Sequence, residues 1–322
     1  GLGYAEAEQL TNEIIAFLHD HASDFSISRK NLEWGIPIPG DPSQTVYVWF
    51  DALINYISAV GYGADEKRFK NLWPTDIHVV GKDIIKFHCA YWPAMLLSAG
   101  LPLPKTVFAH GFFTIDGQKI SKSLGNVIDP LKIINTYGND TLRYYLLREI
   151  TFGEDGDFSF ERLKKRYEPD LANDLGNLVL RVITLFERTW PKENIQNRRG
   201  MPFSVSLEKW TNVKPTYQAY HKAFETYAFD KALDAIWDLI RKGNKRLTEE
   251  KPWENPKKFA DLEPNCLTET LVELHHVGIL LKPFLPDTSL KISEQIKIER
   301  LPHFKDQVFI NVQQAAPLFP CL

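Results

Sequence analysis

The chain has 322 residues and a formal net charge of −3 at pH 7. This length allows two domains with substantial cores, and the nearly neutral balance excludes a bulk attraction to nucleic acid, so any such contact has to come from local basic patches. The three cysteines, Cys89, Cys266 and Cys321, are widely separated, which argues against a disulfide framework or zinc knuckle and favours a reducing compartment. No apolar run is long enough to span a bilayer, and no signal peptide is recognisable.

The first part of the chain predicts one amphipathic helix over residues 1–22. Residues 34–41, Trp-Gly-Ile-Pro-Ile-Pro-Gly-Asp, contain two prolines and two glycines. Prolines are disfavoured in helix interiors and in central strands, so this stretch predicts an extended connector.

Residues 45–110 then alternate strand-like and helix-like segments. Strands are predicted at 45–49, 77–80 and 106–110, with a helix at 51–60 and a second one that Asp83 caps and that runs to about residue 98. Strands that alternate with helices predict a parallel sheet with right-handed crossovers. Because Rossmann-type folds ordinarily contain two such halves, we expect this part to be the second half of one.

From residue 129 on, the pattern is helical almost throughout. Asp129 and Pro130 predict a helix start, and Gly138 its end. Further helices are predicted near 161–190, 216–227, 230–248, 265–283 and 286–295, with Pro169 and Pro191 breaking or bounding the first, Asp230 capping the third, and an extended tail over 309–322 packed on the body. The fold class is therefore α/β plus all-α, with a half Rossmann-type sheet followed by an α-helical bundle.

A stretch rich in lysine, serine and glycine follows the third predicted strand. We call residues 116–126, Asp-Gly-Gln-Lys-Ile-Ser-Lys-Ser-Leu-Gly-Asn, the lysine loop. Asp116-Gly117 is a hairpin turn signal. Lys119 and Lys122 carry compact charges on flexible stems, which suits binding of a phosphate. An ordinary polar surface loop has the same composition, so both interpretations stay open.

The predicted strand ends suggest a second site. Side chains spaced three or four apart share a helix face, so the ends could bring together an apolar pocket with two polar groups, from Trp49, Leu53, Tyr56, Ile84 and His88. Gly81-Lys82-Asp83 offers a close backbone approach and an acceptor for ribose hydroxyls. The alternatives are a plain core with a buried histidine, and a common helix cap.

The helical part offers residue types that recognise unpaired bases. Asn177 and Arg181 are four apart on a predicted helix. Trp253 follows a helix that carries a row of basic residues, Arg241, Lys242, Lys245 and Arg246. Asn and Arg read base edges, and an exposed Trp stacks on a base. A solvated basic face and a core tryptophan would give the same pattern.

Together these stretches carry a resemblance to a known family. Residues 119–123, Lys-Ile-Ser-Lys-Ser, resemble the KMSKS loop of class I aminoacyl-tRNA synthetases, with Ile120 in the place of Met. The stretches WGIPIPGD, VYVWFDALINY, GKDIIKFHCAYWPA, AHGFF, DLGNLVLR and KPW are similar, in this order, to the methionyl-tRNA synthetase family. The resemblance covers nearly all of the chain after about residue 24.

The resemblance implies the domain organisation and the site residues. Residues 1–44 are the end of a connective insertion and a return linker, 45–128 the second catalytic half, 129–165 a stem-contact connector, and 166–322 the anticodon-binding domain and tail. Lys119 and Lys122 are the catalytic residues. The ATP-binding set is Gly81, Asp83, His110, Gly111, Lys119, Ser121 and Lys122. The methionine-binding set is Trp49, Leu53, Tyr56, Ile84, His88 and Trp92. The anticodon-binding set is Asn177, Arg181 and Trp253.

The implied activity is ATP-dependent formation of methionyl-adenylate, with Mg²⁺, and transfer of methionine to tRNA(Met) in the cytoplasm, or in the mitochondrial matrix for an organellar source. No metal ligands and no zinc are expected. The family's HIGH motif does not occur in this sequence, so we expect a carboxyl-terminal fragment that is inactive alone. The alternatives are another class I synthetase for an apolar amino acid and a non-catalytic tRNA- or RNA-binding fragment.

Overall fold

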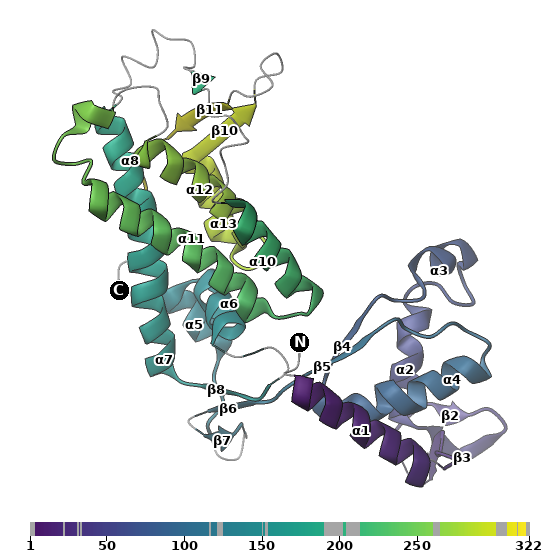
Figure 1. Ribbon diagram of the computed structural model, residues 1–322. Coiled ribbons are helices and arrows are strands. Elements are labelled where there is room, and N and C mark those ends of the chain that lie inside the picture. The colour runs from purple at the N-terminus through teal and green to yellow at the C-terminus, as the bar shows by residue number, and fades with distance from the viewer. Residues whose placement is uncertain are drawn as a thin grey trace. The chain divides into compact units, whose positions relative to one another are not determined.

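The computed structural model describes residues 4–21, 23–30, 32, 34–115, 117–120, 125–149, 151, 154–189, 202–203, 213–259, 265–300, 308–313 and 315–319 (Figure 1). The chain divides into two compact units between Phe112 and Phe113. We call residues 2–112 the amino-terminal unit and residues 113–322 the carboxyl-terminal unit. Within the described ranges, no helix has the length and apolar character needed to cross a membrane.

The amino-terminal unit contains a small antiparallel sheet. After helix α1 (Tyr4–Asp20), the strands β1 (Ser28–Lys30), β2 (Pro37–Ile38) and β3 (Asp41–Val46) pair in the order β1-β3-β2. The predicted parallel strand at 45–49 is therefore wrong, and Trp49 lies in helix α2 (Val48–Ser58). Gly40, at a φ of +88°, turns the chain tightly between β2 and β3, and such a turn joins neighbouring antiparallel strands rather than a crossover.

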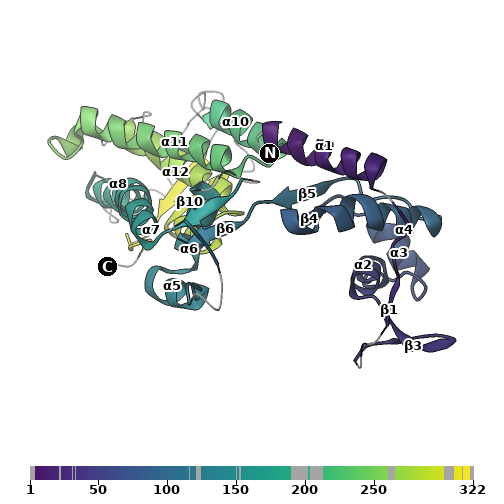
Figure 2. The same cartoon turned by 90° about the horizontal axis from the view of Figure 1, so that it is seen from below.

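The parallel part of this unit is the pair β4 (His78–Gly81) and β5 (Val107–His110), which lie side by side in Figure 2. Helix α3 (Glu66–Leu72) precedes β4, and α4 (Trp92–Ser98) lies between the two strands in the chain. Asp83 is not the predicted cap, because the chain turns directly from Gly81 into a 3₁₀ turn, Lys82–Ile84, that includes Asp83. A π-helical stretch, Phe87–Tyr91, then leads into α4.

The carboxyl-terminal unit begins with a three-stranded sheet. The strands β6 (Phe113–Ile115), β7 (Gln118–Lys119) and β8 (Gly156–Phe158) have the order β7-β6-β8. The predicted hairpin is confirmed, with Gly117 at a φ of +74°. Helix α5 (Pro130–Tyr137) starts at Asp129, whose side chain accepts from the Leu131 N–H, and ends at Gly138 as predicted. Helix α6 (Asn139–Arg148) follows at once.

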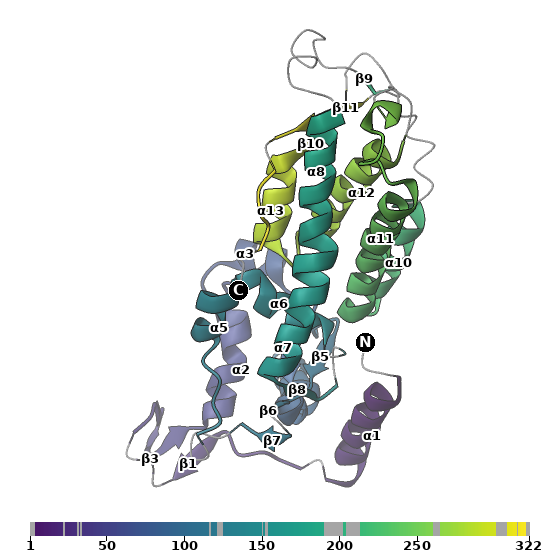
Figure 3. The ribbon, with the colours of Figure 1, turned by 90° about the vertical axis from the view of Figure 1, so that its left-hand side faces the viewer.

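The predicted helical bundle is confirmed. Helix α7 (Phe160–Arg166), a π-helical stretch (Tyr167–Gly176) and α8 (Asn177–Thr189) form one continuous column in Figure 3. The chain passes through Pro169 without breaking, because the wider π turn accommodates a residue without an N–H. The other helices are α10 (Val213–Glu225), α11 (Phe229–Glu250), α12 (Cys266–Leu281) and α13 (Pro286–Gln295). Asp230 does not cap α11; it lies buried in its first turn.

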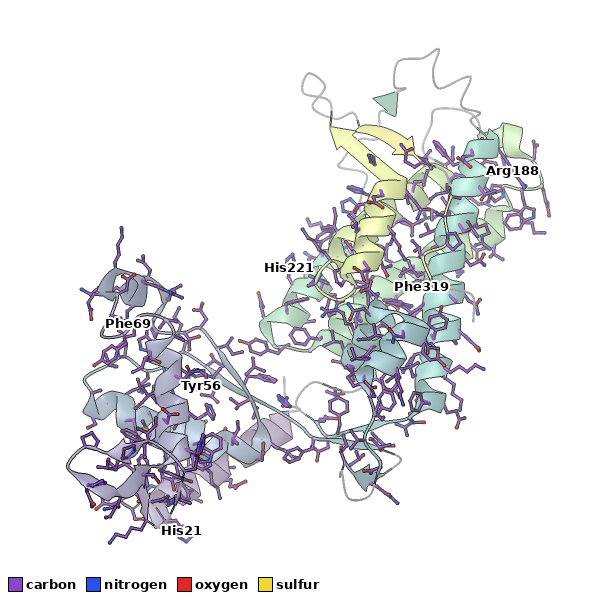
Figure 4. The ribbon with its side chains drawn as sticks, turned by 180° about the vertical axis from the view of Figure 1, so that it is seen from behind. His21, Tyr56, Phe69, Arg188, His221 and Phe319 are labelled. Carbon is purple, nitrogen blue, oxygen red and sulfur yellow. The ribbon has the colours of Figure 1, made fainter. Side chains whose placement is uncertain are left out.

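The segment after α13 packs on the bundle. Strand β10 (Ile296–Arg300) pairs with β11 (Val308–Val312), which pairs with β9 (Pro202–Phe203). The predicted tail is described for residues 308–313 and 315–319. Leu318 in this tail is buried, and the Phe319 ring, labelled in Figure 4, meets the edge of Tyr167. The tail thus begins as a strand and covers the helical column.

One ion pair lies inside the bundle. Arg246 of α11 donates two hydrogen bonds to the Glu273 carboxylate of α12, at 3.0 and 2.7 Å. Glu273 is 5% exposed. An ionised carboxylate at such a site is stable only with a partner, so the pair fixes how α11 packs on α12.

Replacing Arg246 by Met should lower the free energy of unfolding by about 3 kcal/mol, since it leaves a buried carboxylate without its cation. The measurement is urea unfolding followed by circular dichroism. Lys245→Met is the matched control, because Lys245 precedes Arg246 in the sequence but has an exposed side chain. The double variant Arg246→Met/Glu273→Leu should recover most of the loss. An Arg246→Met midpoint equal to that of the control would contradict the argument.

Candidate functional site

A buried histidine with both ring nitrogens engaged lies in the amino-terminal unit. His88 is 1% exposed. Its Nδ1 lies 3.0 Å from the Ile84 carbonyl oxygen, and its Nε2 lies 3.0 Å from the Tyr56 hydroxyl. Because a carbonyl only accepts, Nδ1 donates to Ile84. The two hydrogen bonds together fix the orientation of the imidazole ring.

Aromatic rings surround this histidine. The Trp49 ring stacks on Phe87, with centroids 4.0 Å apart, and meets the His88 ring edge-on. Tyr56, labelled in Figure 4, also contacts the Trp92 ring. Leu53 and Trp92 are each 1% exposed and belong to the same apolar core. The structure therefore brings five of the six predicted pocket residues together through their side chains, while Ile84 contributes its backbone carbonyl. Trp49 comes from the first turn of a helix and not from a strand end.

The sequence analysis missed His78 and Phe87. His78, at the start of β4, accepts a hydrogen bond from the Trp92 indole N–H at 3.3 Å, and its ring lies 4.3 Å from that of Tyr56. Burial above all, and then the nearby His88, lower the pKa of His78 from 6.5 to about 4. Two imidazoles thus lie next to one phenol, whose own pKa burial raises. The site is mainly apolar, and its polar groups are two histidines and one tyrosine.

The ends of the two parallel strands form a second group in the same unit. Gly81 ends β4 directly beside His110, which ends β5. A Cβ on Gly81 would lie 2.6 Å from Oδ1 of Asp83, so any larger residue there would displace the Asp83 carboxylate. His110 donates from Nδ1 to the Gly111 carbonyl oxygen at 3.0 Å. The side chains of Asp83 and His110 are exposed, so this strand edge offers solvent a carboxylate, an imidazole and an open backbone.

The lysine loop is described only at its two ends. Lys119 lies in β7, and its backbone pairs with Thr114 of β6. The Lys119 side chain, Ser121 and Lys122 lie outside the described residues.

The predicted base-binding residues meet on the bundle. Arg181 of α8 places its guanidinium 6.0 Å from the ring centre of Trp253. Trp253 is 42% exposed. Burial lowers the pKa of Arg181, and its Nε has no hydrogen-bond partner among the described residues. Asn177 is exposed one turn earlier on the same helix. A half-exposed ring next to a guanidinium suits stacking of a planar ligand.

A third residue that was not predicted, Asn244 of α11, holds this arginine. Its Oδ1 accepts from Arg181 at 3.3 Å, and its Nδ2 donates to the Asp174 carbonyl oxygen at 2.9 Å. The row of basic residues on α11 is less available than its sequence indicated. Arg246 is bound to Glu273, and Arg241 bonds Asp238 at 2.6 Å. The base-binding group therefore depends on Arg181 and Trp253 rather than on a basic face.

Comparisons with known proteins identify the family. The family described as tRNA synthetases class I (M) matches residues 4–183, which is more than half of the chain. The chain belongs to this family.

Its relatives are methionine–tRNA ligases. That of Thermotoga maritima is 43% identical over 304 residues, which are 93% of this chain and 47% of that protein. That of Bacillus subtilis is 39% identical and covers 99% of this chain and 50% of its own length. The solved methionyl-tRNA synthetase of Mycobacterium tuberculosis in complex with methionyl-adenylate has a TM-score of 0.85 at 33% identity, over 98% of this chain and 64% of that one. The chain spans about half the length of these curated relatives.

His78 makes the stability of the protein depend on pH. Its folded-state pKa of about 4 lies below the unfolded value of 6.5. As the pH falls below 6.5, His78 takes up a proton in the unfolded chain but not in the folded chain. The free energy of unfolding therefore decreases until the pH reaches about 4. Between pH 7.5 and 5.0 this histidine should contribute a loss of about 2 kcal/mol.

The measurement is urea unfolding at both pH values. His78→Asn should reduce the difference between them by about that amount. His21→Asn, at an exposed position of the same unit, serves as the control and should keep the wild-type difference. An unchanged pH dependence in His78→Asn would show that folding does not lower the pKa of His78.

Proposed function

We propose that this chain supplies the lysine-loop half of the active site and the anticodon-binding domain of a cytoplasmic methionine–tRNA ligase. The observation that carries this proposal is its likeness, over 98% of the chain, to a structure that holds methionyl-adenylate. Residues 1–44 are the return from an insertion, 45–128 the catalytic half, 129–165 the connector, and 166–322 the anticodon-binding part.

The proposed first step joins methionine to AMP. A carboxylate oxygen of methionine attacks the α-phosphorus of ATP, a new P–O bond forms, and the bond to the departing pyrophosphate breaks with its electron pair on pyrophosphate. Lys119 and Lys122 stabilise the charge on the phosphoryl oxygens and the leaving group. In the proposed second step, a terminal ribose hydroxyl of tRNA(Met) attacks the activated carbonyl and releases AMP.

The remaining ATP contacts are assigned from the resemblance to the family. Asp83 accepts hydrogen bonds from the ribose, Gly81 allows its close approach, and His110 and Gly111 lie near the adenine, while Ser121 assists the two lysines. The described residues contain no group of three His, Cys, Asp or Glu side chains suited to a metal. We therefore propose that Mg²⁺ is bound mainly through the ATP phosphates, as is usual for this ion.

The aromatic group around His88 is proposed to bind the methionine side chain. Aromatic faces make favourable contacts with a thioether sulfur. Trp49, Tyr56 and Trp92 supply such faces, with Leu53 in the same apolar core, and Ile84 is proposed as a further wall residue. Burial raises the pKa of Tyr56, so its phenol stays uncharged, and this favours an apolar side chain over a charged one.

Methionine-dependent exchange of pyrophosphate with ATP by the full-length protein tests the catalytic assignment. We expect methionine to exceed leucine and valine by at least about tenfold in kcat/KM. Lys119→Ala and Lys122→Ala should each lower kcat by about 100-fold, while Lys105→Ala serves as the lysine control. Exchange with leucine or valine in the absence of exchange with methionine would reject the assignment. A polypeptide of these 322 residues alone should give no exchange.

Binding of an anticodon stem-loop with the sequence CAU tests the role of the bundle. Trp253→Ala should weaken binding by about 10-fold or more, because one base loses its stacking partner. Trp34→Ala is the matched control, since this tryptophan is 91% exposed and lies in the other unit. Equal affinities of the two variants would remove Trp253 from the interface.

A further inference from the structure

A carboxylate outside the groups above holds the hairpin of the lysine loop. Asp157 of β8 accepts a hydrogen bond from the Thr114 hydroxyl at 2.6 Å and another from the Gly117 backbone N–H at 2.7 Å. Both bonds reach the same oxygen, Oδ1. Thr114 above all, and then Gly117, lower the pKa of Asp157, so the acceptor is ionised at neutral pH and both bonds are charge-assisted.

The strand register connects this carboxylate with the first lysine. Thr114 lies opposite Asp157 in the parallel pair β6–β8, and opposite Lys119 in the antiparallel pair β6–β7. Gly117 forms the turn between β6 and β7 at a φ of +74°. One carboxylate oxygen therefore binds both the turn that precedes Lys119 and the residue that pairs with it.

Asp157 is itself fixed by a buried support. Tyr145 of α6 is 0% exposed. Its hydroxyl donates to the Asp157 carbonyl oxygen at 3.3 Å and accepts from the Ser159 N–H at 3.3 Å. The neighbouring Phe158 ring packs edge-on against Tyr145, with centroids 5.1 Å apart. The strand that carries this carboxylate is thus packed against a buried core.

We propose that Asp157 is a positioning residue of the adenylation step: through Thr114 and Gly117 it sets the backbone of Lys119 for contact with ATP. This inference rests on the proposed function and assigns Asp157 no contact with substrate. Its effect should therefore appear in the chemical step and in the use of ATP, and not in methionine binding.

The main test compares Asp157→Ala with Asp157→Asn in the full-length protein, by pyrophosphate exchange. Asp157→Ala should lower kcat by about 10- to 100-fold through misplacement of a catalytic group, while the KM for methionine changes less than about twofold. Asp157→Asn should stay within about threefold of wild type, since an amide oxygen accepts both hydrogen bonds. Glu161→Ala is the acidic control, because Glu161 lies four residues away in an exposed pair with Lys165.

A second readout does not depend on activity. Hydrogen exchange of the Gly117 amide should be faster in Asp157→Ala than in wild type, and close to wild type in Asp157→Asn. Thr114→Val should lower kcat because it removes one of the two bonds, whereas Thr114→Ser keeps the hydroxyl and should restore it.

The outcomes separate this inference from the proposed function. A wild-type protein without methionine-dependent exchange overturns the proposed function. Wild-type exchange accompanied by unchanged kcat and unchanged Gly117 protection in Asp157→Ala overturns the positioning role alone. An Asp157→Asn variant as slow as Asp157→Ala, or a parallel rise in the KM for methionine, overturns it as well, because neither follows from two lost hydrogen bonds at the hairpin.

Discussion

The Tyr144 hydroxyl donates to the Asp170 carboxylate at 2.7 Å in the interior of the carboxyl-terminal unit. Burial and the carboxylate both raise the pKa of Tyr144, so the phenol keeps its proton and the bond is charge-assisted. Arg166 approaches the same carboxylate at 3.4 Å and bonds Glu149 at 2.7 Å. These contacts connect the carboxyl-terminal part of α6 with the start of the π-helical stretch. A π-helical stretch departs from regular α-helical hydrogen bonding, so side-chain bonds stabilise it here. The column from residue 160 to 189 is fixed there.

This helical column connects the strand that carries Asp157 with the residues proposed to bind the anticodon. Its apolar face, with Leu163, Leu171, Leu175 and Val182 each 0% exposed, faces the bundle core or the small core beside the sheet. At its beginning lies β8, which carries Asp157, and near its end lie Asn177 and Arg181. The proposed positioning residue Asp157 and the proposed anticodon-binding residues Asn177 and Arg181 thus lie just before or within one helical column. The π-helical backbone within the column is stabilised by hydrogen bonds from other helices, such as those of Tyr144 and Asn244.

The sequence allowed most helices to be predicted to within a few residues, because an amphipathic repeat is a local property that reports burial directly. The short helix α3 (Glu66–Leu72) was not predicted. The strand at 45–49 was misassigned for a related reason. Its apolar pattern indicated a strand but not a partner, and the turn at Pro39-Gly40 decides the antiparallel pairing. Asp83 and Asp230 were wrong as caps, since a cap depends on which residue begins the helix. Asp230 instead offers its carbonyl oxygen to Arg148, 82 residues away in sequence.

The same limit explains which site residues were found. Tyr56 and His88 were predicted from helical spacing within each segment, and their hydrogen bond joins two such segments. Three supporting residues were not predicted, because each one bonds a partner at least 14 residues away in the sequence. The pairs are His78 with Trp92, Asn244 with Arg181, and Asp157 with Thr114. A sequence motif contains residues that contact a ligand. The residues that support a motif are identified by their contacts in the folded chain, so their local sequence carries only weak signals. One such signal is the alternation of Gly156, Asp157 and Phe158 between the two faces of a strand. For this chain, the supporting carboxylate, amide and imidazole are therefore visible only once the strands and helices are paired.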